Sequence, residues 1–157
     1  MSLKVGDIAP GFTLKSSEKT DVSLSDYTGK NVVVLFFPMA FTSVCTTELC
    51  EIRDKKSNYD ALEADIIAIS VDSPFTLAKF KEDQGYNFPL LSDFNKEVSP
   101  KYGAYYEEFV LGLKGVAKRA AFVVDKEGIL QYVEVLEKAS DIPDFEKINS
   151  VLKTLTA

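Results

Sequence analysis

Apolar runs separated by polar stretches predict the strands of this chain. Residues 31–37, NVVVLFF, and residues 66–72, IIAISVD, are nearly continuous apolar runs rich in β-branched side chains, which is typical of strands buried on both faces. Residues 119–125, RAAFVVD, and residues 129–136, ILQYVEVL, flank the turn sequence DKEG and predict a β-hairpin. The sequence FPLLSD, at residues 88–93, predicts one further short extended segment.

Three longer segments have the pattern of helices. Residues 44–62 are rich in Glu, Lys and Leu and lack Gly and Pro, which favours one continuous helix. Residues 74–84 follow Ser73, a typical N-cap, start with a proline and end before Gly85, so they predict a second helix. Residues 141–155, DIPDFEKINSVLKTL, predict an amphipathic helix.

The order of these elements predicts a single α/β domain over residues 1–157. Residues 7–14 and 21–27 are short, turn-bounded segments that predict a small N-terminal β-region. Strand, helix and strand then follow, with a hairpin and a helix later, so a central mixed sheet flanked by helices is expected. This layout is compatible with a thioredoxin-like fold, although periodicity alone does not select it.

Composition and charge narrow the function classes. The 157 residues are 46% hydrophobic and 27% charged, the balance of a soluble globular protein. A formal net charge of −6 and scattered lysines argue against nucleic-acid binding. The sequence shows neither a secretory h-region nor an apolar run of about 18 residues, so we expect a cytoplasmic protein with no membrane partner.

The chain has two cysteines and no histidine. Without histidine, Ser-His-Asp and Cys-His catalysis are excluded, and two thiols alone leave a tetrahedral zinc site incomplete. We therefore expect no metal. In the cytoplasm, two cysteines indicate catalytic or redox-sensing thiols rather than a permanent disulfide.

Cys45 lies where the predicted strand 31–37 gives way to the predicted helix 44–62. In the first turn of a helix, unpaired N–H groups and the positive end of the helix dipole favour the thiolate, which is the reactive form. Thr42 or Ser43 can cap the helix or direct a hydroxyl at a small ligand. Pro38 ends the strand without adding an N–H group and can shield the sulfur from water.

These residues resemble the active site of the peroxiredoxins. The segment from Pro38 to Cys45, PMAFTSVC, matches the family motif P-x-x-x-T-x-x-C through Pro38, Thr42 and Cys45. Glu48 stands where the family has Glu or Gln, and VAKRAAFVVDKEG resembles the segment that carries the family's active-site arginine, here Arg119. DIAPGFTL, AISVDSP and FPLLSD extend the resemblance over nearly the whole chain, and it implies a thioredoxin-like fold.

The resemblance implies a thiol-dependent peroxidase that needs no cofactor. The Cys45 thiolate would reduce hydrogen peroxide or an organic hydroperoxide and become a sulfenic acid. Thr42, loop N–H groups and Arg119 would stabilise the developing charge, Pro38 would help to build the pocket, and Glu48 would orient the arginine. Arg53, the only other arginine, is a candidate member of the same network.

The role of Cys50 is open on sequence grounds. Five residues along an α-helix separate the Cα atoms of Cys45 and Cys50 by on the order of 8.5 Å, beyond disulfide range, so a disulfide requires the helix to unwind. The PrxQ-like (bacterioferritin-comigratory) branch has a resolving cysteine at this offset and implies a thioredoxin- or glutaredoxin-type reductant. FFPMAFTSVCTTEL resembles the AhpE-like branch instead, whose members can lack a resolving cysteine. A one-cysteine enzyme with a structural Cys50 is therefore the alternative.

Tyr102, Tyr105, Tyr106 and Phe109 have helical spacing, which predicts a stripe facing the core. The alternative is a partly exposed apolar rim, together with Phe41, that admits organic peroxides or forms a homodimer contact.

Two rival functions remain for the thiols. A thiol-disulfide oxidoreductase expects two cysteines separated by two residues, whereas four residues separate these. A non-enzymatic redox sensor would need a partner protein instead of turnover.

Overall fold

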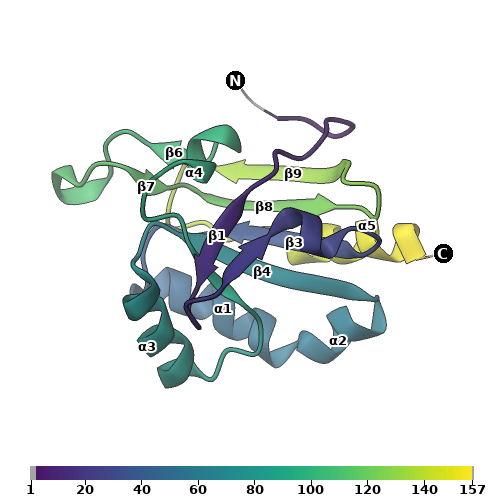
Figure 1. Ribbon diagram of the computed structural model, residues 1–157, viewed down its shortest axis with the longest axis horizontal. Coiled ribbons are helices and arrows are strands. Elements are labelled where there is room, and N and C mark those ends of the chain that lie inside the picture. Colours follow the sequence, from purple (N-terminus) through teal and green to yellow (C-terminus); the bar gives the residue numbers. More distant parts are fainter. Residues whose placement is uncertain (1–2, 157) are drawn as a thin grey trace.

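The computed structural model describes residues 3–156 and every side chain in that range except that of Cys45. Seven strands of this part of the chain form one mixed sheet in the order β2-β1-β5-β4-β3-β8-β9 (Figure 1). Their bounds are β1 Thr13–Ser16, β2 Asp21–Ser23, β3 Asn31–Phe36, β4 Ala64–Ser70, β5 Leu90–Ser92, β8 Arg119–Val124 and β9 Leu130–Leu136. The central strands β3, β4 and β5 are parallel, and every other pairing in this sheet is antiparallel.

The strand predictions are confirmed. The predicted hairpin is β8 and β9, and its turn closes through a hydrogen bond from the Asp125 N–H to the Ile129 carbonyl at 2.9 Å. Gly128 adopts a φ of 81° in this turn, a conformation that glycine accepts without steric cost. The N-terminal β-region exists too, but it extends the main sheet, because Lys15 of β1 pairs with Ser92 of β5.

The helices are α1 Ser43–Asp54, α2 Lys56–Ala61, α3 Pro74–Gln84, α4 Val98–Lys101 and α5 Phe145–Thr156, with 3-10 turns at Leu24–Tyr27 and Val110–Gly112. Helix α3 is confirmed in detail. The Ser73 hydroxyl accepts a hydrogen bond from the Thr76 N–H, and Gly85 ends the helix in the left-handed conformation. The prediction of one helix over residues 44–62 is wrong, because Lys55 leaves the helical conformation (φ −105°, ψ 16°) and separates α1 from α2.

Two further sequence predictions need correction. The last helix begins at Phe145 instead of residue 141, because the Asp144 carboxylate caps it by accepting from the Lys147 N–H. The aromatic stretch is not a helix. Gly103, with a φ of 68°, follows the short helix α4, and Tyr105–Tyr106 form strand β6, which pairs with β7, Val116–Ala117.

The continuous apolar strands lie between two hydrophobic cores. In β3 and the residue after it, Val33, Leu35 and Phe37 face a core shared with α1, α2, α3 and α5. The alternate residues Val32, Val34 and Phe36 face a second core that contains Tyr102 and the N-terminal segment around Phe12. Each strand therefore presents apolar side chains on both faces, as expected for parallel strands covered on both sides. Within residues 3–156, no helix combines the length and apolar character needed to cross a membrane.

Candidate active site

The connection from β3 to α1 lies at the carboxyl ends of the parallel strands (Figure 1). Pro38, two residues after β3, is buried, and Phe41 adopts a positive φ of 66°, which is uncommon for a residue with a side chain. The Phe41 ring is half exposed and contacts the Phe80 ring of α3, with centroids 4.9 Å apart. The chain therefore turns sharply before the first turn of α1.

Asp72 holds this connection in place from the neighbouring strand. The Ala40 N–H donates to Asp72 Oδ2 at 2.7 Å, and the Ser70 hydroxyl donates to the same oxygen at 2.6 Å. Sequence reasoning did not identify Asp72. The signal available was its position, because Asp72 follows β4 and Ala40 follows β3, and the carboxyl ends of two paired parallel strands meet at one edge of the sheet.

Thr42 is the N-cap residue of α1, with an extended backbone and an exposed side chain. Its side chain does not cap the helix. The Thr42 hydroxyl donates instead to the Met39 carbonyl at 2.9 Å, which leaves its oxygen lone pairs available as acceptors. Cys45 is the third residue of α1, so its backbone N–H is among the first four, which lack partners within the helix. The side chain of Cys45 lies outside the described part of the chain.

The structure brings Glu48 and Arg119 together in the interior. Arg119 Nη1 donates to Glu48 Oε1 at 2.8 Å, and both side chains are almost completely buried. Arg119 Nε donates to the Ala139 carbonyl at 3.1 Å, so the guanidinium group is fixed from two directions. Arg119 is the first residue of β8, where Ala120 pairs with Phe36 at the end of β3. The arginine therefore lies at the same edge of the sheet as the start of α1.

Burial dominates the electrostatics of Glu48. Desolvation raises the pKa of its carboxyl group to about 7, against the opposing effects of the Arg119 charge and hydrogen bond. Glu51 and Glu134 add smaller increases because both are carboxylates nearby. Glu48 Oε2 has no hydrogen-bond partner among the described side chains. This carboxyl group therefore titrates near neutral pH.

Arg53 and Cys50 lie apart from this pair. Arg53 donates through Nε to Asp54 Oδ1 at 2.9 Å and through Nη1 to the Gln84 carbonyl, so its suggested membership of the Glu48–Arg119 network is wrong. Cys50 is partly buried, and its sulfur lies 3.5 Å from Gln84 Oε1 and 3.8 Å from the Tyr86 hydroxyl. Because α1 includes both Cys45 and Cys50, their Cα atoms are on the order of 8.5 Å apart by helix geometry.

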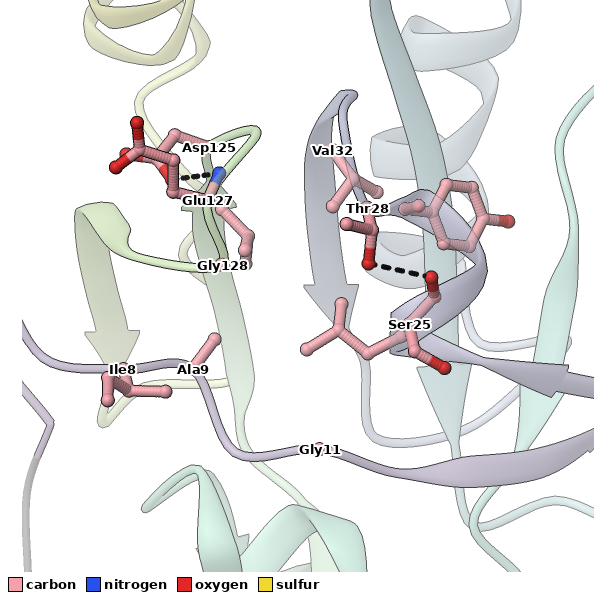
Figure 2. Close-up of a pocket in the computed structure, with 12 residues that line it drawn as sticks. Ile8, Ala9, Gly11, Ser25, Thr28, Val32, Asp125, Glu127 and Gly128 are labelled. Carbon is pink, nitrogen blue, oxygen red and sulfur yellow. Dashed lines mark hydrogen bonds between the residues drawn. The ribbon is translucent and has the colours of Figure 1, made fainter.

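A separate apolar cavity lies at the other end of β3, beside Val32 and the β8–β9 turn (Figure 2). It has a volume of about 210 Å³, and its rim includes Thr28, Asp125 and Gly128. The Thr28 hydroxyl donates to the Ser25 carbonyl, and the Asp125 carboxylate accepts from the Glu127 N–H, so both groups are already hydrogen-bonded within their own turns.

Among the described side chains, no cluster of three or more Cys, Asp or Glu residues could hold a metal ion.

Comparison with known proteins places this chain in a family. Residues 5–133 match the AhpC/TSA family. A putative peroxiredoxin of Mycobacterium tuberculosis is 41% identical over 140 residues, which cover 88% of each chain. Alkyl hydroperoxide reductase E of Mycobacterium bovis is 38% identical over 158 residues, which cover 99% of each chain.

The crystal structure of peroxidoxin BcpB from Mycobacterium tuberculosis matches this chain with a TM-score of 0.86 and 30% identity over 98% of each chain. The α/β architecture is therefore the thioredoxin-like fold that the sequence led us to expect. The chain belongs to the AhpC/TSA family, the peroxiredoxins, and is a peroxidase.

Proposed function

We propose that Cys45 is the peroxidatic nucleophile and that Arg119 and Thr42 complete its site. The observation that carries this proposal is the buried Arg119–Glu48 pair at the edge of the sheet where α1 begins. A buried guanidinium group is costly unless its charge has a use or a partner. Here Glu48 and the Ala139 carbonyl orient it beside the helix terminus, where a reacting thiolate would need a fixed positive charge.

In the proposed reaction the Cys45 thiolate attacks the terminal oxygen of a hydroperoxide. A sulfur–oxygen bond forms, the oxygen–oxygen bond breaks, and the leaving oxygen takes a proton to become water or an alcohol. The sulfur is oxidised to the sulfenic acid and the peroxide is reduced. Arg119 and the free N–H groups of the first helical turn stabilise the negative charge on the oxygens, Thr42 offers acceptor lone pairs, and Pro38 excludes water.

Cys50 is proposed as the resolving thiol. Its sulfur attacks the sulfenic sulfur of Cys45, a disulfide forms, and water leaves. Because the intact helix holds the two Cα atoms on the order of 8.5 Å apart, α1 must unwind before this step. A dithiol protein of the thioredoxin or glutaredoxin type then reduces the disulfide by exchange.

A one-cysteine cycle is the second candidate, and a specific observation favours it. Cys50 packs against the core beside Gln84 and Tyr86, so its sulfur already has a structural environment in the closed helix. In that cycle an external thiol reduces the Cys45 sulfenic acid directly.

A homodimer is compatible with either cycle. Phe41, Phe75 and Phe94 follow the parallel strands β3, β4 and β5, and their exposed rings offer an apolar contact surface.

Steady-state peroxide consumption tests these roles. With hydrogen peroxide or cumene hydroperoxide and a thioredoxin system as reductant, the wild type is expected to turn over and Cys45→Ser to be inactive. Cys50→Ser is expected to lose turnover with thioredoxin while keeping the first oxidation, which one equivalent of peroxide measures separately. Full thioredoxin-dependent turnover by Cys50→Ser would refute the resolving role, and activity in Cys45→Ser would refute the nucleophile.

A further inference from the structure

The carboxyl ends of α1 and α3 are tied together by two reciprocal hydrogen bonds. Arg53, in the last turn of α1, donates through Nη1 to the carbonyl of Gln84, the last residue of α3. Asn87, just beyond α3, donates through Nδ2 to the Arg53 carbonyl at 3.3 Å. Carbonyls in the last turn of a helix lack partners within the helix, so each bond satisfies a group that the helix itself leaves open.

The same part of α3 also contacts the middle of α1. The Tyr86 hydroxyl donates to the Thr46 carbonyl at 3.5 Å, and the Cys50 sulfur donates to Gln84 Oε1 at 3.5 Å. The contacts of residues 84–87 with α1 therefore extend from Thr46 to Arg53. Cys50 lies within this stretch, and the residues that must unwind to free it are those that the contacts hold.

We propose that Arg53 and Asn87 clamp α1 in its helical state and set how often α1 opens. This inference rests on the proposed resolving role of Cys50 for its consequence, because opening of α1 limits how often Cys50 reaches Cys45. Arg53 is a positioning residue in this account, since its bonds go to Gln84 and Asp54 and not to the buried pair of Glu48 and Arg119.

A weaker clamp should separate the two chemical steps. The first oxidation needs the closed helix, which remains the major state even when a rare open state becomes about ten times more populated. Disulfide formation proceeds through the open state, so its rate rises in proportion to that population. A residue that merely supports the fold would slow the first oxidation when replaced, whereas a clamp residue should accelerate the second step alone.

The test compares Arg53→Met with Lys55→Met, with Asn87→Ala as a second variant. Met keeps the unbranched stem of Arg53 but removes its donors. Lys55 is a matched control, because it carries the same charge at the end of α1 and its ion pair is with Glu51 of the same helix. Two rates are measured: amide hydrogen exchange of residues 46–50 in the reduced protein, and disulfide formation after one equivalent of hydrogen peroxide, quenched with a thiol alkylating agent.

For Arg53→Met we expect both rates to rise about tenfold, the effect of losing one charge-assisted hydrogen bond in a partly exposed position. Asn87→Ala should raise both rates about threefold, and Lys55→Met should change them less than about twofold. The second-order rate of the first oxidation should stay within about twofold of wild type in all three variants. Amide exchange in β3 and β4 reports whether each variant keeps the global fold.

The inference is overturned if exchange of residues 46–50 in Arg53→Met matches that in Lys55→Met while the fold is intact. It is also overturned if exchange accelerates but disulfide formation keeps its wild-type rate. Faster exchange in Arg53→Met, with no disulfide in any protein including the wild type, would support the clamp on α1 and refute the resolving role of Cys50 instead.

Discussion

Glu48 carries a carboxyl group that the fold buries completely and that, among the described side chains, is paired through one oxygen only. Its pKa in the folded protein is about 7, compared with a usual value of 4.5. Between these two values the folded state binds more protons than the unfolded state. The contribution of Glu48 to stability is therefore fully present below pH 4.5 and is lost as the pH rises through about 7.

Replacing Glu48 by Gln should remove this pH dependence. The amide oxygen can still accept from Arg119 Nη1, but it has no charge to lose or gain. We expect the free energy of unfolding of the wild type to fall, relative to Glu48→Gln, by on the order of 3 kcal/mol between pH 4.5 and pH 7.5. Urea unfolding across this range measures the difference, and parallel pH curves for the two proteins would contradict the account.

The resemblance to the peroxiredoxins supplied the residues of the proposed site. Pro38, Thr42 and Glu48 come from the family motif around Cys45, and Arg119 from the family-like segment that begins the hairpin. Asp72 was missed because its role depends on the lateral adjacency of β3 and β4, which no local spacing shows. The suggestion that Arg53 belongs to the network of Glu48 and Arg119 was wrong, because helix rotation directs Arg53 toward α3.

Among the elements, the connection between β3 and α1 depends most on a neighbour for its shape. The Asp72 carboxylate holds the Ala40 N–H two residues before Thr42, and Phe41 between them has a positive φ. A backbone conformation of this kind persists only when the surroundings enforce it. Asp72 is therefore expected to control how well the start of α1 is aligned for reaction.

Replacing Asp72 by Ala should slow the first oxidation of Cys45 about tenfold, since one anchoring hydrogen bond to the active-site connection is lost. Asp72→Asn is the matched control, because it keeps an oxygen that can accept from Ala40 and should lose less than about threefold. Competition for hydrogen peroxide against a reference peroxidase gives these rates. Equal rates for Asp72→Ala and the wild type would show that the connection needs no such anchor.

The strands and α3 could be predicted from sequence because local signals determine them. Buried parallel strands need continuous apolar runs, and α3 has both its N-cap serine and its terminal glycine. The prediction of a helical stripe in the aromatic stretch was wrong, because the helical spacing of its aromatic residues, Tyr105 and Tyr106 among them, is coincidental. A left-handed Gly103 and long-range pairing with Val116–Ala117 determine the structure there, and a local pattern contains neither signal.

At the scale of the whole molecule, the sheet brings together residues that are far apart in the sequence. Glu48 and Arg119 are 71 positions apart, and they meet because β8 pairs with β3 and α1 packs over that face of the sheet. The sequence predicted an α/β layout but not this order of strands. The family resemblance supplied the thioredoxin-like fold, and the comparison with solved structures confirmed it.

Intact mass and free-thiol titration after one equivalent of hydrogen peroxide test the central claim most directly. The account predicts that the wild type loses both thiols and about 2 mass units, while Cys50→Ser gains about 16 mass units as a sulfenic acid on Cys45. A wild type that instead keeps one thiol and gains about 16 mass units would contradict the two-cysteine cycle. Failure of Cys45 to oxidise in either protein would contradict its assignment as the peroxidatic nucleophile.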